Sequence, residues 1–301
     1  MKEKLKTTLV GWQGIAAEVP ADWSLAAIGG DEKSGYFRVD STRSMALEAK
    51  WSSASSQADL RGMLERYLSD LKRKSRKRRI DFDYRIKSKE HGALSFTWQA
   101  DRRAVGRLWR CDECSRVVIA QVSGAPSDNV AEAASLILPS FEDHSDEGWR
   151  TWAAYDLIAE VPPGYRLEKH QLMAGYIQLV FRKRSNRLVI ERWGLADVAL
   201  KKTTLADWYA ERVRNDFRYY RYTVAAVDAE DEPALRITGK RRGVRQLVRS
   251  LGETVIRRRP AVFLDSYVWL CKESNKIYSV QSVHSKPEQI LDEVVERVEC
   301  H

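Results

Sequence analysis

Apolar residues recur at two periods along this chain, every second residue in some segments and every third or fourth in others. The first period predicts half-buried strands and the second predicts helices. One helix of this kind is predicted near the middle of each half of the chain. Its apolar positions are Leu60, Met63, Leu64, Leu68 and Leu71 in the first half and Leu205, Trp208, Tyr209 and Val213 in the second.

Short sequence matches recur in the two halves in one constant order. They pair AEVPADWSL (17–25) with AEVPPGYRL (159–167), Gly35-Tyr36 with Gly175-Tyr176, Trp51 with Trp193, ALSFT (93–97) with ALRIT (234–238), and the hairpin 108–122 with 268–282. Self-similarity of this extent indicates a repeat. We interpret the chain as two tandem copies of one domain, residues 1–147 and 148–301.

Each copy is predicted to contain three strands, a helix, about four strands and a final helix, the last at about 129–138 and 287–296. Strands joined by short turns favour an antiparallel sheet, against which the helices pack. The predicted fold class is therefore α+β, with two mostly antiparallel sheets in β3-α-β4-α order. The polar, acidic segment 142–156 is interpreted as the linker between the copies, and its two tryptophans could pack against a domain.

The opening pattern of each copy, Val-Pro-x-x-Trp/Tyr-x-Leu followed by Gly-Tyr, resembles the Mog1/PsbP-like fold. It is carried by VPADWSL (19–25) with Gly35-Tyr36, and by VPPGYRL (161–167) with Gly175-Tyr176. Proteins of that fold are mostly non-enzymatic binding or assembly factors: a nuclear-transport GTPase partner, photosystem subunits and bacterial lipoproteins. Tandem copies and the missing export signal depart from the lumenal and lipoprotein members. The resemblance implies binding without identifying a partner.

The formal net charge is +9, from 51 Lys and Arg against 42 Asp and Glu. An excess of this size favours anionic partners without selecting one. No segment approaches the roughly 20 apolar residues of a membrane-spanning helix, and the basic N-terminus lacks the apolar run of a signal peptide. Four cysteines do not make a disulfide framework. We therefore expect a cytoplasmic protein.

Basic residues are concentrated directly after the first predicted helix. They are Lys72, Arg73, Lys74, Arg76, Lys77, Arg78 and Arg79. Such a run is either a solvated loop or an anion-binding segment. At the matching place in the second half, Arg218 and Arg221 are interleaved with Tyr219, Tyr220 and Tyr222. Interleaved arginines and aromatics are typical of single-stranded nucleic-acid binding, although the tyrosines also fit one face of a strand.

A segment found only in the second half, 239–260, is rich in arginine. Its basic residues are Arg241, Arg242, Arg245 and Arg249, which lie largely off an apolar helical face, and then Arg257, Arg258 and Arg259. An amphipathic basic helix could meet a phosphate backbone, an anionic membrane surface or an acidic protein. The alternative, which we favour, is a long hairpin or surface helix docked by its apolar face.

The pair Cys111 and Cys114 has the spacing of half a zinc knuckle. Cys271, Cys300 and His301 are the other ligands considered, and no second CxxC exists. Cys114 also corresponds to Ser274 in the second half. We therefore expect no metal, and no cofactor.

The sequence contains no Walker loop, GxGxxG, GxSxG or HExxH motif. The hypothesis is a non-catalytic binding or scaffold protein whose basic surface engages an anionic macromolecule, either nucleic acid or an acidic protein. The alternative is an enzyme or metal-dependent protein with a site between the two copies. A deep pocket that holds perturbed acids would favour the enzyme.

Overall fold

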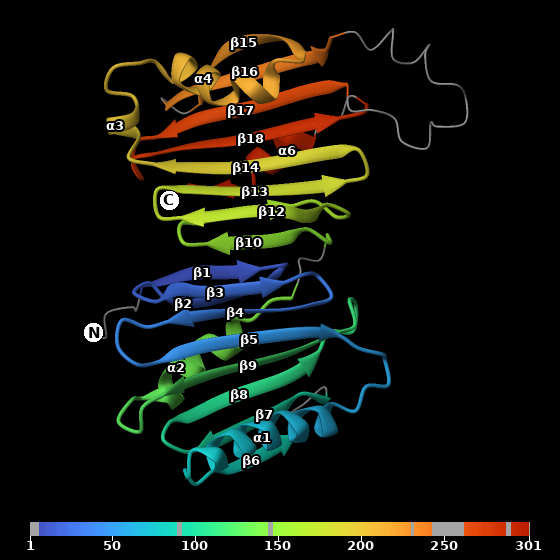
Figure 1. The fold of residues 1–301 in the computed structure, drawn as a ribbon, viewed down its shortest axis with the longest axis vertical. Coiled ribbons are helices and arrows are strands. Elements are labelled where there is room, and N and C mark those ends of the chain that lie inside the picture. The colour runs from blue at the N-terminus through green and yellow to red at the C-terminus, as the bar shows by residue number, and fades with distance from the viewer. Residues whose placement is uncertain are drawn as a thin grey trace. The chain divides into compact units, whose positions relative to one another are not determined.

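The chain forms two compact units, unit 1 (Met1–Tyr155) and unit 2 (Asp156–His301) (Figure 1). The computed structural model describes residues 6–88, 92–143, 147–229, 232–242, 262–286 and 290–300.

Unit 1 is built on a seven-stranded antiparallel sheet. From one edge to the other its strands are β3 (Ser24–Gly30), β4 (Ser34–Asp40), β5 (Ala46–Ser53), β9 (Arg116–Gly124), β8 (Arg103–Arg110), β7 (Leu94–Gln99) and β6 (Asp83–Ser88). The hairpin predicted over 108–122 is confirmed, because β8 and β9 pair from Arg103↔Gly124 to Arg110↔Val117.

Two helices cover opposite faces of this sheet, α1 (Leu60–Lys77) in front and α2 (Val130–Ile137) behind in Figure 1. The α1 face buries Leu64, Leu68 and Phe96 in one apolar cluster. A short 3-10 helix, η2 (Leu138–Ser140), follows α2. The predicted helices are confirmed in both places.

Three further strands of unit 1 pair in the order β10-β1-β2: β10 (Arg150–Ala154), β1 (Thr7–Trp12) and β2 (Ile15–Pro20). Trp152 of β10 packs edge to face on Trp12, with 4.9 Å between ring centroids, and both are almost fully buried. The segment 142–156 was interpreted as the linker between the copies, with two tryptophans that could pack against a domain. Its second half is a strand that shares the core of unit 1.

Unit 2 contains a second seven-stranded antiparallel sheet with the same order of connections. Its strands are β12 (Arg166–Met173), β13 (Tyr176–Lys183), β14 (Asn186–Gly194), β18 (Lys276–His284), β17 (Phe263–Cys271), β16 (Glu232–Arg241) and β15 (Tyr220–Ala229). The helices among its described residues are α3 (Ala196–Ala199), α4 (Leu205–Phe217) and α6 (Ile290–Val295). In addition, β11 (Leu157–Val161) pairs with β19 (Val298–Glu299).

The predicted fold class, tandem α+β copies in β3-α-β4-α order, is wrong. Strands far outnumber helices among the described residues and form three sheets in place of the predicted two. In unit 1, five strands precede α1, where the prediction had three. One reason is the β1–β2 hairpin, whose two-residue turn places Gln13 at φ 58° and Gly14 at φ 82°. Asn-Gly or Asp-Gly is the usual sequence signal for such a turn. The sequence Gln13-Gly14 lacks that signal, so a turn was not predicted between β1 and β2.

The sequence match between Trp51 and Trp193 conceals a difference in register. Trp51 pairs with Val118, and its ring lies 6.4 Å from Phe37 on the α2 face. Trp193 pairs with Ile277 and packs on Trp208 of α4. A shift of one residue moves a strand side chain to the other face of the sheet. Trp51 therefore packs on the α2 face of its sheet, whereas Trp193 packs on the face of its own sheet that α4 covers.

In the part of the chain that the structure describes, no helix is long and apolar enough to cross a membrane.

We predict that fragments 1–155 and 156–301 fold separately, because each contains its own sheet and buried apolar clusters. Each fragment should give a cooperative thermal transition by circular dichroism. Two unfolded fragments from a full chain that folds would contradict this prediction.

Candidate anion-binding surface

The helix α1 is fixed to the sheet of unit 1 by its apolar side. Asp59 caps its N-terminus, where the Asp59 carboxylate accepts a hydrogen bond of 2.9 Å from the Gly62 backbone N–H. Leu64 and Leu68 are fully buried against β7, β8 and β9. The orientation of the helix about its own axis is therefore set by the core, and its opposite side faces solvent.

The sequence placed the basic run after the helix, as a solvated loop or an anion-binding segment, but the helix extends to Lys77 and most of the run is helical. Lysine and arginine are good helix formers, and cations at a helix C-terminus interact favourably with the helix dipole. We call the exposed basic residues of this segment the α1 basic surface. Its members are Lys72, Arg73, Lys74, Arg76, Lys77, Arg78 and Arg79.

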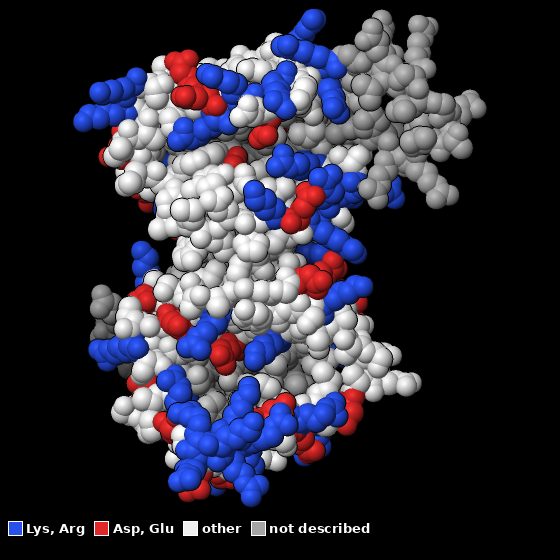
Figure 2. All heavy atoms as spheres, viewed as in Figure 1, with Lys and Arg blue, Asp and Glu red and all other residues white. Residues whose placement is uncertain are grey.

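The α1 basic surface is only partly neutralised. Arg73 pairs with Asp70 and Arg78 with Asp101, each at 2.8 Å. Among the described residues, no ion pair is found for the other members, Lys72, Lys74, Arg76, Lys77 and Arg79. In Figure 2, basic side chains gather over the part of unit 1 where α1 lies.

Arg79 ends the helix in a left-handed conformation, with φ 57°. The Arg79 N–H donates to the Arg76 carbonyl and the Ile80 N–H to the Ser75 carbonyl, both at 3.0 Å. These two bonds form a Schellman motif, in which glycine is the preferred residue at the left-handed position. The chain therefore places a cation where glycine would be less strained.

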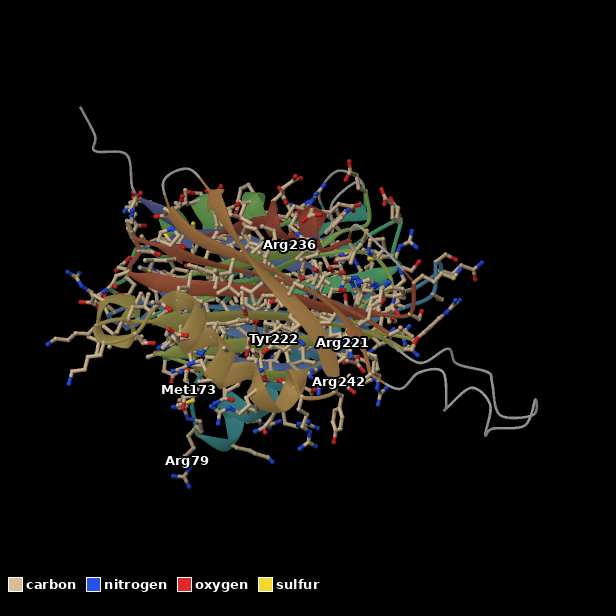
Figure 3. The ribbon with its side chains drawn as sticks, turned by 90° about the horizontal axis from the view of Figure 1, so that it is seen from above. Arg79, Met173, Arg221, Tyr222, Arg236 and Arg242 are labelled. Atoms are coloured by element: carbon tan, nitrogen blue, oxygen red, sulfur yellow. The ribbon has the colours of Figure 1, made fainter. Side chains whose placement is uncertain are left out.

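Unit 2 presents basic and aromatic residues at the end of α4 and the start of β15. The Arg218 guanidinium lies over the Tyr219 ring, 4.5 Å from its centroid. The Arg242 N–H donates to the Tyr219 carbonyl at 2.8 Å. Tyr219 and Tyr222 are both exposed. In Figure 3, Arg221, Tyr222 and Arg242 lie near one another.

The interleaved arginines and tyrosines do not form one surface. Tyr220 and Tyr222 point to the α4 side of the sheet, where Tyr220 is buried and Tyr222 packs edge to face on Phe217 at 5.6 Å. Arg221 lies between them in the strand and points to the other face. Alternation along β15 therefore separates this cation from these rings.

Of the predicted basic residues in the insertion, Arg241 ends β16 and Arg242 follows it, and both are exposed. Arg245, Arg249, Arg257, Arg258 and Arg259 lie outside the described residues.

Two hollows flank α2 on the sheet of unit 1. One has a volume of about 1020 Å³ and is lined by Ser95, Val105, Arg107 and Ser135, among others. The other has a volume of about 380 Å³ and includes Asp83. Among the described residues that line them, neither hollow brings two carboxylates together, the arrangement that general acid–base chemistry often uses.

A buried carboxylate does occur in unit 2, inside the core. Glu191 accepts hydrogen bonds from the Tyr176 hydroxyl at 2.5 Å, the Gln178 amide at 2.8 Å and the Ser279 hydroxyl at 3.3 Å. Burial raises the pKa of Glu191 above its usual value. With every hydrogen bond directed to neighbouring side chains, this group fits a structural network.

Cys111 and Cys114 lie at the turn between β8 and β9. Burial raises the pKa of the Cys114 thiol to about 11. Asp143 approaches both cysteines, and the buried Arg116 binds Asp143. Sequence analysis did not single out Arg116 or Asp143. Asp143 belongs to the segment interpreted as a linker, so no pattern indicated that it returns to this hairpin.

We predict that Arg79→Gly raises the free energy of unfolding by about 0.5–1 kcal/mol, because glycine relieves the left-handed strain. Arg76→Gly, three residues earlier and inside the helix, is the matched control and should lower it by about 1 kcal/mol. Urea unfolding measures both. Destabilisation by Arg79→Gly would contradict the assignment of strain at this position.

We predict that Glu191→Gln stabilises unit 2 at neutral pH. Below the ordinary carboxyl pKa of 4.5, Glu191 is protonated in both states. As the pH rises, the unfolded chain ionises first, because the folded pKa is raised, and stability is lost until the folded pKa is passed. Glutamine removes this loss and can keep the three hydrogen bonds.

Urea unfolding from pH 4.5 to 7 should therefore show an advantage of the variant over wild type that grows with pH. An advantage that shrinks with pH would contradict the raised pKa.

No family model matches the chain, and no curated protein matches it. Among solved structures, the Ran-binding protein Mog1p of Saccharomyces cerevisiae aligns with a TM-score of 0.31 and 8% identity, over 48% of this chain and 90% of that one. The immunity protein TplEi of the Pseudomonas aeruginosa T6SS aligns in its apo form with a TM-score of 0.34 and 9% identity, over 98% and 96%. Its complex with "L" peptide gives 0.33 and 9%, over 99% of both chains. These similarities are too low to assign a function.

Proposed function

We propose that this chain is a non-catalytic binding protein that engages an anionic partner through the α1 basic surface. The observation that supports the proposal is the set of five exposed cations for which no ion pair is found among the described residues. Four of them stand on a helix that the core holds in one orientation, and the fifth, Arg79, directly follows its C-cap. A rigid array of this kind presents positive charge without first having to be ordered.

The arrangement has a cost in the unbound protein. Lys72 and Arg76, Arg73 and Lys77, and Lys74 and the C-cap residue Arg78 are like-charged pairs four residues apart along the helix. Each such pair destabilises a helix by a few tenths of a kcal/mol, or about 0.2–0.5. An anionic partner would relieve this repulsion, which adds to the attraction that brings the two together.

An acidic protein surface fits the α1 basic surface better than nucleic acid does. Sequence-tolerant binding of single strands combines cations with aromatic faces for base stacking. The exposed large apolar side chains of the described residues include none on α1. In unit 2, Arg221 and Tyr222 point to opposite faces of β15. We therefore propose an acidic protein as the partner.

We predict that the full chain binds a polyglutamate peptide, and that binding weakens steeply as salt is added. Replacing Arg76, Lys77, Arg78 and Arg79 together by Gln should weaken binding roughly tenfold or more, because several charge contacts of a few tenths of a kcal/mol each are lost. The melting temperature should stay nearly constant, since these side chains lie outside the core. Fluorescence anisotropy and thermal unfolding measure the two effects.

The matched control replaces Lys169, Arg184, Lys201 and Lys202 by Gln, which removes the same charge from exposed positions of unit 2. It should leave most of the affinity intact. Equal losses in both variants would mean that net charge alone drives binding. Tighter binding to single-stranded RNA than to polyglutamate at equal charge would replace the acidic protein by nucleic acid. No binding to either polyanion at low salt would end the proposal.

A further inference from the structure

The hairpin turn between β8 and β9 places two thiols on one side of the chain. The Cys111 N–H donates to the Arg116 carbonyl at 2.8 Å, and the Ser115 N–H donates to the Cys111 carbonyl at 3.1 Å. Ser115 has φ 56°, which closes the turn in the left-handed region. A CxxC turn of this kind is the usual source of two ligands in zinc knuckles.

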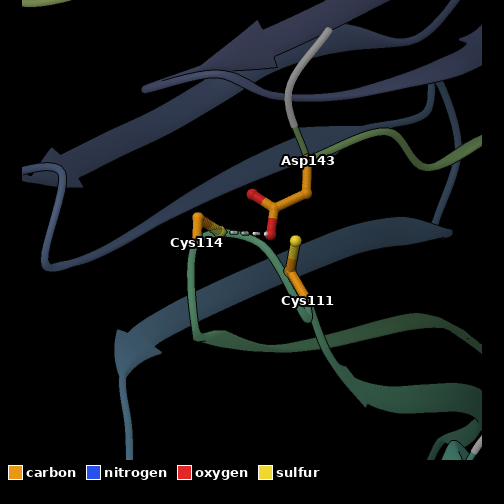
Figure 4. Close-up of side chains that lie close together, drawn as sticks. All are labelled: Cys111, Cys114 and Asp143. Carbon is orange, nitrogen blue, oxygen red and sulfur yellow. Dashed lines mark hydrogen bonds between the residues drawn. The ribbon is translucent and has the colours of Figure 1, made fainter. Parts of the chain in front are cut away.

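A third potential ligand, Asp143, reaches this turn from the segment that follows α2. Its Oδ2 atom lies 3.2 Å from the Cys114 Sγ. Figure 4 shows Cys111, Cys114 and Asp143 close together, and one donor atom from each lies within 4.8 Å of the other two. In a tetrahedral zinc site the sulfur and oxygen ligands stand about 3.6 Å apart. The observed spacing needs only small side-chain adjustments to reach that value.

Arg116 fixes the position of Asp143. Its guanidinium is buried and donates one hydrogen bond to the Asp143 Oδ1 atom and another, of 2.6 Å, to the Asp143 carbonyl. A third bond, of 2.8 Å, goes to the Gln13 carbonyl in the β1–β2 turn. The other carboxylate oxygen, Oδ2, contacts the Cys114 sulfur and does not bind Arg116. Outer-shell contacts of this kind orient metal ligands in proteins.

The charges of these groups match a divalent cation. Two thiolates and one carboxylate carry three negative charges, and Arg116 contributes one positive charge. A doubly charged ion brings the cluster to neutrality, and this compensates the charges of the buried Arg116 and Asp143 side chains at the inner side of the site. Soft thiolates select zinc over magnesium or calcium.

We propose that Cys111, Cys114 and Asp143 bind one Zn²⁺ ion, with a water molecule as the fourth ligand. Binding releases the two thiol protons to solvent. The ion would join the β8–β9 turn to the segment that precedes β10. The sequence-based expectation of no metal rested on the lack of a second CxxC, with Cys271, Cys300 and His301 as the other ligands considered, and on Ser274 at the place of Cys114 in the second half. Asp143 supplies a ligand that was not considered there. This inference does not depend on the proposed anionic partner.

The chain offers an internal comparison in the hairpin β17–β18, where Ser274 occupies the place of Cys114. Cys114→Ser therefore introduces a residue that an equivalent turn of the same protein already accepts. Asp143→Asn removes the anionic ligand and keeps an oxygen that can accept from Arg116. Cys300→Ser is the matched control, because it removes a thiol from unit 2.

The test is reconstitution of the full chain with zinc under reducing conditions, followed by dialysis and elemental analysis. We expect one zinc per chain for wild type and for Cys300→Ser, and about a tenth of that or less for Cys114→Ser. Asp143→Asn should weaken zinc binding by about tenfold or more in competition with a chromophoric chelator. With cobalt in place of zinc, wild type should show thiolate-to-metal charge-transfer absorption that Cys114→Ser lacks.

Zinc should also raise the melting temperature of wild type but not of Cys114→Ser, because an ion that binds only the folded state stabilises it. A folded, reduced wild-type chain that retains no zinc and shows no cobalt–thiolate absorption would overturn the proposal. Full zinc content in Cys114→Ser, or its loss in Cys300→Ser, would overturn it as well.

Discussion

Burial of Leu64 and Leu68 against the sheet of unit 1 is the contact on which the arrangement of the α1 basic surface depends. A helix has only one apolar stripe, so fixing that stripe in the core fixes the direction of every other side chain. Seven basic residues are thereby held outside the core at the end of α1. Their mutual repulsion is tolerated because burial of the apolar stripe outweighs it.

Arginine has two opposite roles within unit 1. On α1 it is exposed to solvent. In the β9 strand, Arg116 is buried and binds Asp143 and the Gln13 carbonyl, so that its charge serves to position other groups. A buried guanidinium requires such partners, because a charge removed from water without compensation is costly. The same residue type is therefore solvent-exposed on α1 and a buried positioning group in β9.

Unit 2 shares the strand order of unit 1, yet its polar groups are arranged differently. Glu191 occupies the α4 face of the sheet and is buried with three hydrogen-bond donors around it. At the edge strand β15, the arginine and tyrosine positions diverge to opposite faces. A common backbone arrangement thus does not carry over the chemistry of individual sites.

The sequence by itself determined the helices α1 and α4, the β8–β9 hairpin and the concentration of cations near residue 76, because these depend on local spacing. It could not determine the β1–β2 turn at Gln13-Gly14, the length of α1 through its basic residues, or the faces of Trp51 and Trp193. Register and strand pairing are set by contacts between distant segments. The approach of Asp143 to Cys114, 29 residues away in the chain, is of the same kind. Only the tertiary structure brings those atoms together.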